Sequence, residues 1–349
     1  MHGTTIAVDL AKAVFEVALS EHPGQVRERR RLTRAQFQRF LAQQPPARLV
    51  MEACGSAHYW GRWAQGHRHE VILLPPHAVR PYVLRNKTDR TDTKGLLEAL
   101  RNEEVRPVPV KPETQQAIAS LHRFRSSWLA ARTARINTMR GLLREFGLVI
   151  PTGARQVRPG VTMLIEDVDS GVPSLLRPAL AEAAQELREI DARIRRVEQQ
   201  LEAVAAETVT VTQLRTIPGI GLLTATALFA CVGDVQRFPS GRHFASYLGL
   251  TPRERSSGLQ RHLGKISKRG DTYLRMLLIH GARSVLNHAK RRPTPDRLCA
   301  WALRLERERG HNRAAVALAN KLARIAWAVW KTGQGYRGAA PEGTPADDI

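Results

Sequence analysis

Four acidic residues in the first hundred positions are placed where they could hold a metal ion. Asp9 interrupts an apolar run at positions 6–8, and Glu52 directly follows another apolar run at positions 49–51. An unpaired carboxylate inside an apolar strand is costly, so a compensating partner is expected. Asp89 and Asp92 are three residues apart at the start of a helical segment and can point the same way.

Carboxylate oxygens are the ligands that Mg²⁺ prefers, and two such ions could clamp the attacking and leaving oxygens of a phosphodiester. The four acidic residues therefore predict a site for one or two Mg²⁺. Taken alone, Asp89 and Asp92 could equally cap or solvate a helix start. The combination of a strand-borne Asp9 with a strand-end Glu52 favours the metal site.

A second candidate for chemistry is the pair Ser256 and Ser257, which precedes Gly258 in a strongly basic segment at positions 249–271. A serine hydroxyl is a poor nucleophile unless a base, a metal or positive charge assists it, and positive charge is abundant here. The spacing by itself is more typical of a phosphate-contacting turn than of a catalytic serine. Six basic residues of this segment are expected to contact nucleic acid: Arg253, Arg255, Arg261, Lys265, Lys268 and Arg269.

The sequence LRTIPGIGLLTATAL at positions 214–228 predicts a turn between two apolar helices. It resembles a helix-hairpin-helix, in which glycines let backbone N–H groups approach a DNA phosphate. Gly219 and Gly221 are therefore candidate nucleic-acid contacts. A plain structural turn between two helices is the alternative interpretation.

Residues 1–110 must position the carboxylates, and their pattern is that of an α/β domain. Strands are predicted at 4–10, 14–20, 25–32, 48–53 and 70–74, with an extended segment at 105–110. Thr33 and Gln36 form a capping box that opens a helix through Leu41. Further helices are expected at 56–65, around 79–83, and at 92–101.

Residues 111–208 are predicted to be helical, with one helix at 113–146 and a second that carries an apolar heptad seam. The seam residues are Leu180, Leu187, Ile194 and Leu201, together with Ala183, Ile190, Val197 and Val204. This pattern is typical of a coiled coil. A seam between subunits, giving a dimer or tetramer, is the favoured interpretation, and a helical hairpin within one chain is the alternative. Residues 209–335 form a mainly helical third domain, and 336–349 are expected to be a disordered tail.

The composition indicates a polyanionic partner. The 349 residues include 54 Lys and Arg but only 32 Asp and Glu, for a formal charge of +22. Nucleic acid is favoured over a membrane surface because each neutralised phosphate releases counterions. Three cysteines without metal-ligand spacing exclude a disulfide framework or zinc ribbon. With no leader pattern and no long apolar run, a cytoplasmic, nucleoid-associated bacterial protein is expected.

Several longer motifs make the sequence recognisable. They are AVDLAKAVFEVAL, VMEACGSAHYW, RNKTDRTDTKGLLEAL, LRTIPGIG, ASYLGLTPRERSSG and GKISKRGDTYLRMLLIHGAR. Together they resemble the DEDD-type insertion-sequence transposases, the family that includes the Piv DNA invertase. The resemblance covers nearly the whole chain.

The resemblance implies a RuvC-like, RNase H-type first domain whose four catalytic, metal-binding carboxylates are Asp9, Glu52, Asp89 and Asp92. It assigns the nucleophile to the serine directly before glycine, Ser257. Lys12 and Lys87, which lie in the matching motifs, become further candidate nucleic-acid contacts. Members act on DNA, and several are guided by a structured RNA transcribed from the element's own end, so such an RNA is a candidate partner. A metal-only junction nuclease and an inactive nucleic-acid-binding remnant are the competing interpretations.

Overall fold

The computed structural model describes residues 4–22, 24–83, 89–258 and 260–337. Its contacts divide the chain into two compact units, Met1–Gln116 and Ala117–Ile349. The boundary lies a few residues beyond the predicted end of the first domain at 110. The second unit contains both 117–208 and 209–335, so the predicted division between these two segments stays a prediction.

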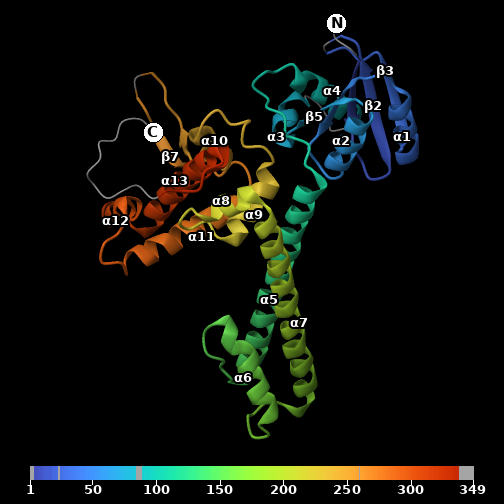
Figure 1. Ribbon diagram of the computed structural model, residues 1–349. Coiled ribbons are helices and arrows are strands. Elements are labelled where there is room, and N and C mark those ends of the chain that lie inside the picture. The colour runs from blue at the N-terminus through green and yellow to red at the C-terminus, as the bar shows by residue number, and fades with distance from the viewer. Residues whose placement is uncertain (1–3, 23, 84–88, 259, 338–349) are drawn as a thin grey trace. The chain divides into compact units, whose positions relative to one another are not determined.

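A five-stranded mixed sheet forms the centre of the first unit (Figure 1). Its strand order is β3-β2-β1-β4-β5. Its strands are β1 (Thr5–Asp9), β2 (Val14–Ser20), β3 (Glu28–Thr33), β4 (Arg48–Glu52) and β5 (Glu70–Leu74). β1, β4 and β5 are parallel to one another, whereas β2 and β3 run antiparallel to their neighbours. The arrangement is compatible with a DEDD nuclease-like domain.

Both faces of this sheet are buried because the inner strands are apolar almost throughout. On one face, Ile6 and Val8 pack with helices α1 (Arg34–Gln43) and α2 (Ala57–Gly66). On the other face, Ala7 and Val50 pack with α3 (Pro76–Val79) and α4 (Asp89–Leu100). The predicted capping box is present at the start of α1. A short 3-10 helix, η1 (Arg80–Tyr82), follows α3, and the predicted extended segment at 105–110 makes a single bridge, Leu73 to Val108.

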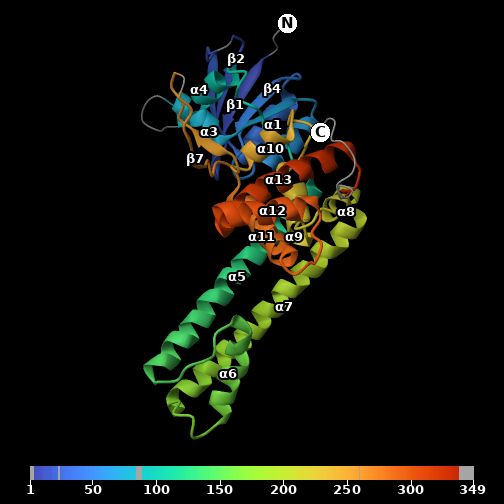
Figure 2. The ribbon, with the colours of Figure 1, turned by 90° about the vertical axis from the view of Figure 1, so that its left-hand side faces the viewer.

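A helical arm follows, made of α5 (Glu113–Glu145), α6 (Ala154–Glu166) and α7 (Arg177–Glu207), with η2 (Ser174–Leu176) before α7 (Figure 2). The arm belongs to the second unit from Ala117 of α5 onward. Three ion pairs join α5 to α7 in antiparallel order: Arg125–Glu198 at 2.8 Å, Arg132–Asp191 at 2.6 Å and Arg135–Glu186 at 2.6 Å.

The apolar heptad seam of α7 is buried within this chain. Leu180 and Leu187 pack against residues of α5 and α6, and Leu201 packs with Ile118 of α5. The favoured expectation, that this seam joins two subunits, is therefore corrected: α5 and α6 already cover it. The packing fits the alternative interpretation, a helical hairpin within one chain.

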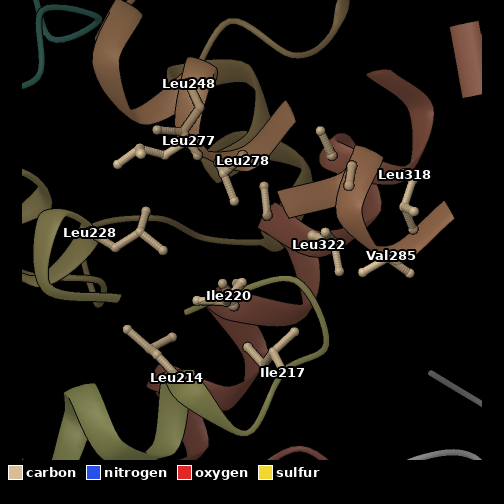
Figure 3. Close-up of a cluster of buried hydrophobic side chains, with 14 of the residues drawn as sticks. Leu214, Ile217, Ile220, Leu228, Leu248, Leu277, Leu278, Val285, Leu318 and Leu322 are labelled. Atoms are coloured by element: carbon tan, nitrogen blue, oxygen red, sulfur yellow. The ribbon is translucent and has the colours of Figure 1, made fainter. Parts of the chain in front are cut away.

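The rest of the second unit packs around one large apolar core, part of which Figure 3 shows. Its helices are α8 (Val209–Arg215), α9 (Leu222–Val232), α10 (Gly241–Tyr247), α11 (Thr272–Ala289), α12 (Arg297–Arg309) and α13 (His311–Thr332). A hairpin of β6 (Pro252–Glu254) and β7 (Leu263–Ile266) lies between α10 and α11 in sequence. No helix in the described part of the chain is long and apolar enough to cross a membrane.

The predicted disordered tail begins too early. Tyr336 packs against the core, and its backbone N–H donates to the Thr216 hydroxyl at 2.7 Å. The remainder of that prediction, from 338 onward, lies outside the described residues.

The turn between α8 and α9 packs unusually closely against α11. Gly219 has a φ of 82°, and an added Cβ there would lie 2.8 Å from the carbonyl oxygen of Gly281. A Cβ on Gly281 would lie only 2.0 Å from the carbonyl oxygen of Gly219. Two glycines are therefore required where the turn meets the helix.

Replacing Gly281 by alanine should lower the free energy of unfolding by about 3 kcal/mol, because backbone has to move to admit the methyl group. Gly141→Ala is the matched control, since that helical glycine has nothing within 4 Å of its Cβ position. The control should stabilise by about 0.5–1 kcal/mol through the better helix propensity of alanine. Chemical denaturation of both variants measures the difference, and equal stabilities would contradict the close packing.

Candidate active site

The carboxyl ends of β1 and β4 bring two of the predicted carboxylates together. Val8 pairs with Met51 in the parallel register, so Asp9 and Glu52 occupy equivalent positions at the ends of neighbouring strands. Because side chains alternate along a strand, both residues lie on the face where Ala7 and Val50 pack against α4. Ligand sites in open α/β sheets form at this edge.

Asp92 joins them from α4. It lines a pocket of about 730 Å³ together with Asp9, Glu52 and Leu96. Asp92 and Leu96 are four residues apart and share one face of α4. The structure thus brings together three of the four predicted carboxylates, each of them half-buried.

The fourth predicted carboxylate cannot be placed in the same way. Asp89 is the first residue of α4, but its side chain lies outside the described part of the chain, as does Lys87. Among the described residues, no three His, Cys, Asp or Glu side chains are gathered closely enough to hold one ion. The chemistry of the donor set, three carboxylates around one pocket, nevertheless fits a hard divalent cation.

The thiol of Cys54 lies close enough to respond to this negative charge. Burial raises its pKa above the ordinary value, and the charges of Glu52 and Asp9 raise it further. The Cys54 thiol therefore stays protonated at neutral pH.

Two residues of this pocket were missed by reasoning from the sequence. His77 and Arg80 follow the end of β5 and line the pocket beside the carboxylates. The sequence could have indicated them, because they follow β5 and parallel strands end at the same edge of a sheet. A guanidinium and an imidazole here could contact a phosphate group.

Ion pairs around the buried carboxylate of Glu16 support the helix that carries Asp92. Glu16 on β2, directly opposite Asp9 and only 4% exposed, lies 3.9 Å from the Arg29 guanidinium and 3.8 Å from that of Arg31. Arg29 also donates to the Thr93 hydroxyl at 2.9 Å and to the Arg90 carbonyl at 3.2 Å. One guanidinium therefore ties two strands to the first turns of α4.

Removing that guanidinium by Arg29→Ala should destabilise the first unit by about 3 kcal/mol, because Glu16 loses a partner inside the protein and α4 loses its tether. Arg31→Ala is the matched control on the same strand. Its side chain is 69% exposed, so we expect an effect under about 1 kcal/mol. Thermal unfolding of both variants compares them; a larger loss for Arg31→Ala would reverse the assignment.

The two candidate serines have different surroundings. The Ser256 hydroxyl donates to Glu254 Oε1 at 2.8 Å, and Arg261 Nε donates to the same oxygen at 3.0 Å. These two bonds hold the Glu254 pKa below its ordinary value. Ser257 is tied only through its backbone, which exchanges hydrogen bonds with Gln260. Within the described chain, the Ser257 hydroxyl has no hydrogen-bond partner and is exposed.

The predicted basic contacts of this segment all reach solvent. They are Arg253, Arg255, Arg261, Lys265, Lys268 and Arg269. Lys12 is also exposed, in the turn that follows Asp9. Of the two glycines, Gly221 is open to solvent, whereas packing against α11 already accounts for Gly219. The close packing already explains why position 219 requires glycine, so a phosphate contact at Gly219 stays a prediction.

Comparison with known proteins defines the class. Residues 6–147 match a family model named for the DEDD transposase of IS110, and residues 211–302 match the model described as "Transposase IS116/IS110/IS902 family". The first match spans all three carboxylates that line the pocket, Asp9, Glu52 and Asp92, and the second spans the serine hairpin.

Relatives extend the match over the whole chain. A Pseudomonas aeruginosa protein named "Probable family 20 transposase" is 43% identical over 97% of this chain and 99% of its own length. The "Transposase for insertion sequence element IS1111A" of Coxiella burnetii is 38% identical over 95% of this chain and 91% of its own. A "Pilin gene-inverting protein" of Moraxella lacunata is 27% identical over 61% of this chain and 59% of its own. The chain belongs to the IS110/IS116/IS902 family of insertion-sequence transposases.

Proposed function

We propose that this transposase cuts and rejoins DNA through a covalent link between Ser257 and a DNA phosphate, assisted by divalent metal at the pocket of Asp9, Glu52 and Asp92. The observation that carries the proposal is the meeting of these three carboxylates in one pocket at the ends of parallel strands. The hydroxyl of Ser257, which is exposed and makes no hydrogen bond to any described residue, supports the proposed role of this serine as the nucleophile.

In the proposed reaction, the Ser257 oxygen attacks the phosphorus and loses its proton. The bond between phosphorus and the leaving strand oxygen breaks, and that oxygen gains a proton. The resulting phosphoserine diester conserves the energy of the original bond, so a hydroxyl of another strand can displace Ser257 without ATP.

Asp9, Glu52, Asp92 and, by the family resemblance, Asp89 would hold one or two Mg²⁺. When bound, the metal supplies charge stabilisation for the phosphate oxygens and helps to deprotonate the attacking hydroxyl. The carboxylates themselves orient the site and keep it negatively charged until metal binds. The exposed arginines of the serine hairpin would hold the DNA backbone through charge-assisted hydrogen bonds.

The working form would be an oligomer, because recombination between two duplexes cuts four strands. Since the α7 seam is buried within the chain, the subunits would associate through another surface. A structured RNA from the element's own end would be a second nucleic-acid partner, and the charge of +22 is large enough for more than one polyanion. Like other proteins that act on the chromosome, the transposase would work in the bacterial cytoplasm, at the nucleoid.

The competing function is a metal-dependent junction nuclease in which water replaces serine as the nucleophile. The two reactions differ in their products. With end-labelled element DNA and Mg²⁺, the serine reaction leaves protein attached to DNA on a denaturing gel, and protease digestion removes the shift. Products with free ends and no attached protein at any time point would establish the nuclease instead.

A further inference from the structure

A groove beside the serine hairpin is not used by the function proposed above. It has a volume of about 1170 Å³ and is lined by the β6–β7 hairpin, by one face of α13 and by Trp301 of α12. Ser257 belongs to the loop that connects the two strands of this hairpin. The groove therefore lies next to the segment that carries the proposed nucleophile.

The lining of the groove is positively charged. Lys265 contributes from the hairpin, and Arg313, Lys321 and Arg324 contribute from α13. Among the described residues that line it, none is an Asp or Glu. Burial lowers the Lys321 pKa, and the neighbouring charges of Arg324 and Arg297 lower it further. An anionic occupant is the partner that such a surface fits.

The groove also has an apolar floor. Val316 and Ala317 lie on the same face of α13 as the cations, and Leu263 of the hairpin faces the groove although it is 55% exposed. The Lys321 ammonium lies 4.4 Å from the Trp301 ring centre, at the edge of this floor. Duplex DNA presents mainly phosphates and sugars to a flat surface. An unpaired strand presents both phosphates and exposed base faces, so it matches a lining that mixes cations with apolar side chains.

We propose that this groove binds an unpaired segment of the DNA strand on which Ser257 acts. Arg313, Arg324 and Lys265 contact its phosphates, while Leu263 and Val316 contact base faces. The inference rests on the proposed function for the identity of the strand. The charge and the apolar floor argue for single-stranded nucleic acid independently of the serine chemistry.

The test uses full-length protein carrying Ser257→Ala, so that binding is measured without cleavage. The probe is a labelled single-stranded DNA of about 15 nucleotides, a length that covers a typical single-strand site. Anisotropy titrations at several salt concentrations compare Arg313→Ala/Arg324→Ala with a matched double variant, Arg304→Ala/Arg307→Ala. The control removes two exposed charges from α12, outside the groove.

The groove variant should bind the single strand about tenfold more weakly. The slope of its log binding constant against log salt concentration should be shallower by about 1.4, because two phosphate contacts are lost. The control should keep the original slope. Leu263→Gln should weaken single-strand binding but leave binding of the matching duplex unchanged, and Arg313→Lys/Arg324→Lys should restore the slope. Thermal unfolding checks that each variant is folded.

Equal losses of single-strand affinity in the groove and control variants would overturn the proposal. It would also be overturned if the groove variant lost as much affinity for duplex DNA as for the single strand, or if the protein bound RNA of the same sequence more tightly than the DNA. A covalent adduct in wild-type protein, combined with unaffected single-strand binding in the groove variant, would retain the serine function and reject the groove. The reverse pattern would retain the groove and reject the serine function.

Discussion

Replacing Asp9 by asparagine should reduce metal-dependent DNA cleavage by about three orders of magnitude, which corresponds to about 4 kcal/mol of transition-state stabilisation. The substitution keeps the size of the side chain but removes one of the charges that would hold the cation. Asp9 lies at the end of β1 beside Glu52, so its loss acts at the centre of the pocket. Cleavage of labelled element DNA over a range of Mg²⁺ concentrations measures the effect.

Asp169→Asn is the matched control, since this exposed carboxyl lies after α6, far along the chain from the pocket residues. It should cleave like the wild type. Full cleavage by Asp9→Asn at all metal concentrations would make the carboxylate pocket structural rather than catalytic.

Ser257→Ala should abolish the covalent protein–DNA adduct while DNA binding persists. The substitution removes only the hydroxyl group, which makes no hydrogen bond among the described residues, so the fold should be unaffected. Ser256→Ala is a closely matched control. Its hydroxyl donates to Glu254, and we expect this variant to form the adduct at a rate within about tenfold of wild type, since one exposed hydrogen bond is lost.

Adduct formation on element DNA, followed by peptide mapping, separates the two serines. An adduct that persists in Ser257→Ala but disappears in Ser256→Ala would move the nucleophile by one residue. An adduct that persists in both variants would remove serine from the mechanism.

Much of the first unit could be predicted from the sequence because its signals are local. Apolar runs of strand length, the Thr33–Gln36 capping box and the acidic residues at strand ends lie within a few residues of the elements that they define. The meeting of Asp9 with Glu52 also follows from parallel strand ends sharing one edge. The link from Glu16 through Arg29 to α4 could not be read in this way, since it joins residues far apart in sequence.

The second unit was predicted less well because long-range packing decides it. The heptad seam of α7 is real, but the sequence pattern does not reveal which helix covers it, and α5 and α6 do so within the chain. Helix α6 was not among the predicted helices, because Pro159 lies inside it and a proline in a helix interior removes a backbone hydrogen bond. Its Val157 and Val161 are nevertheless buried in the apolar cluster of the arm. The groove on α13 likewise forms only when the β6–β7 hairpin folds beside that helix.

The proposed mechanism requires that the metal at the carboxylate pocket and the hydroxyl of Ser257 act on the same phosphate. The most direct test replaces one non-bridging oxygen of the scissile phosphate by sulfur and measures formation of the serine adduct. Mg²⁺ prefers oxygen to sulfur, so the adduct should form poorly in Mg²⁺ and recover when thiophilic Mn²⁺ or Cd²⁺ is added. Adduct formation in Mg²⁺ at the same rate with either sulfur isomer as with the unmodified phosphate would contradict the account.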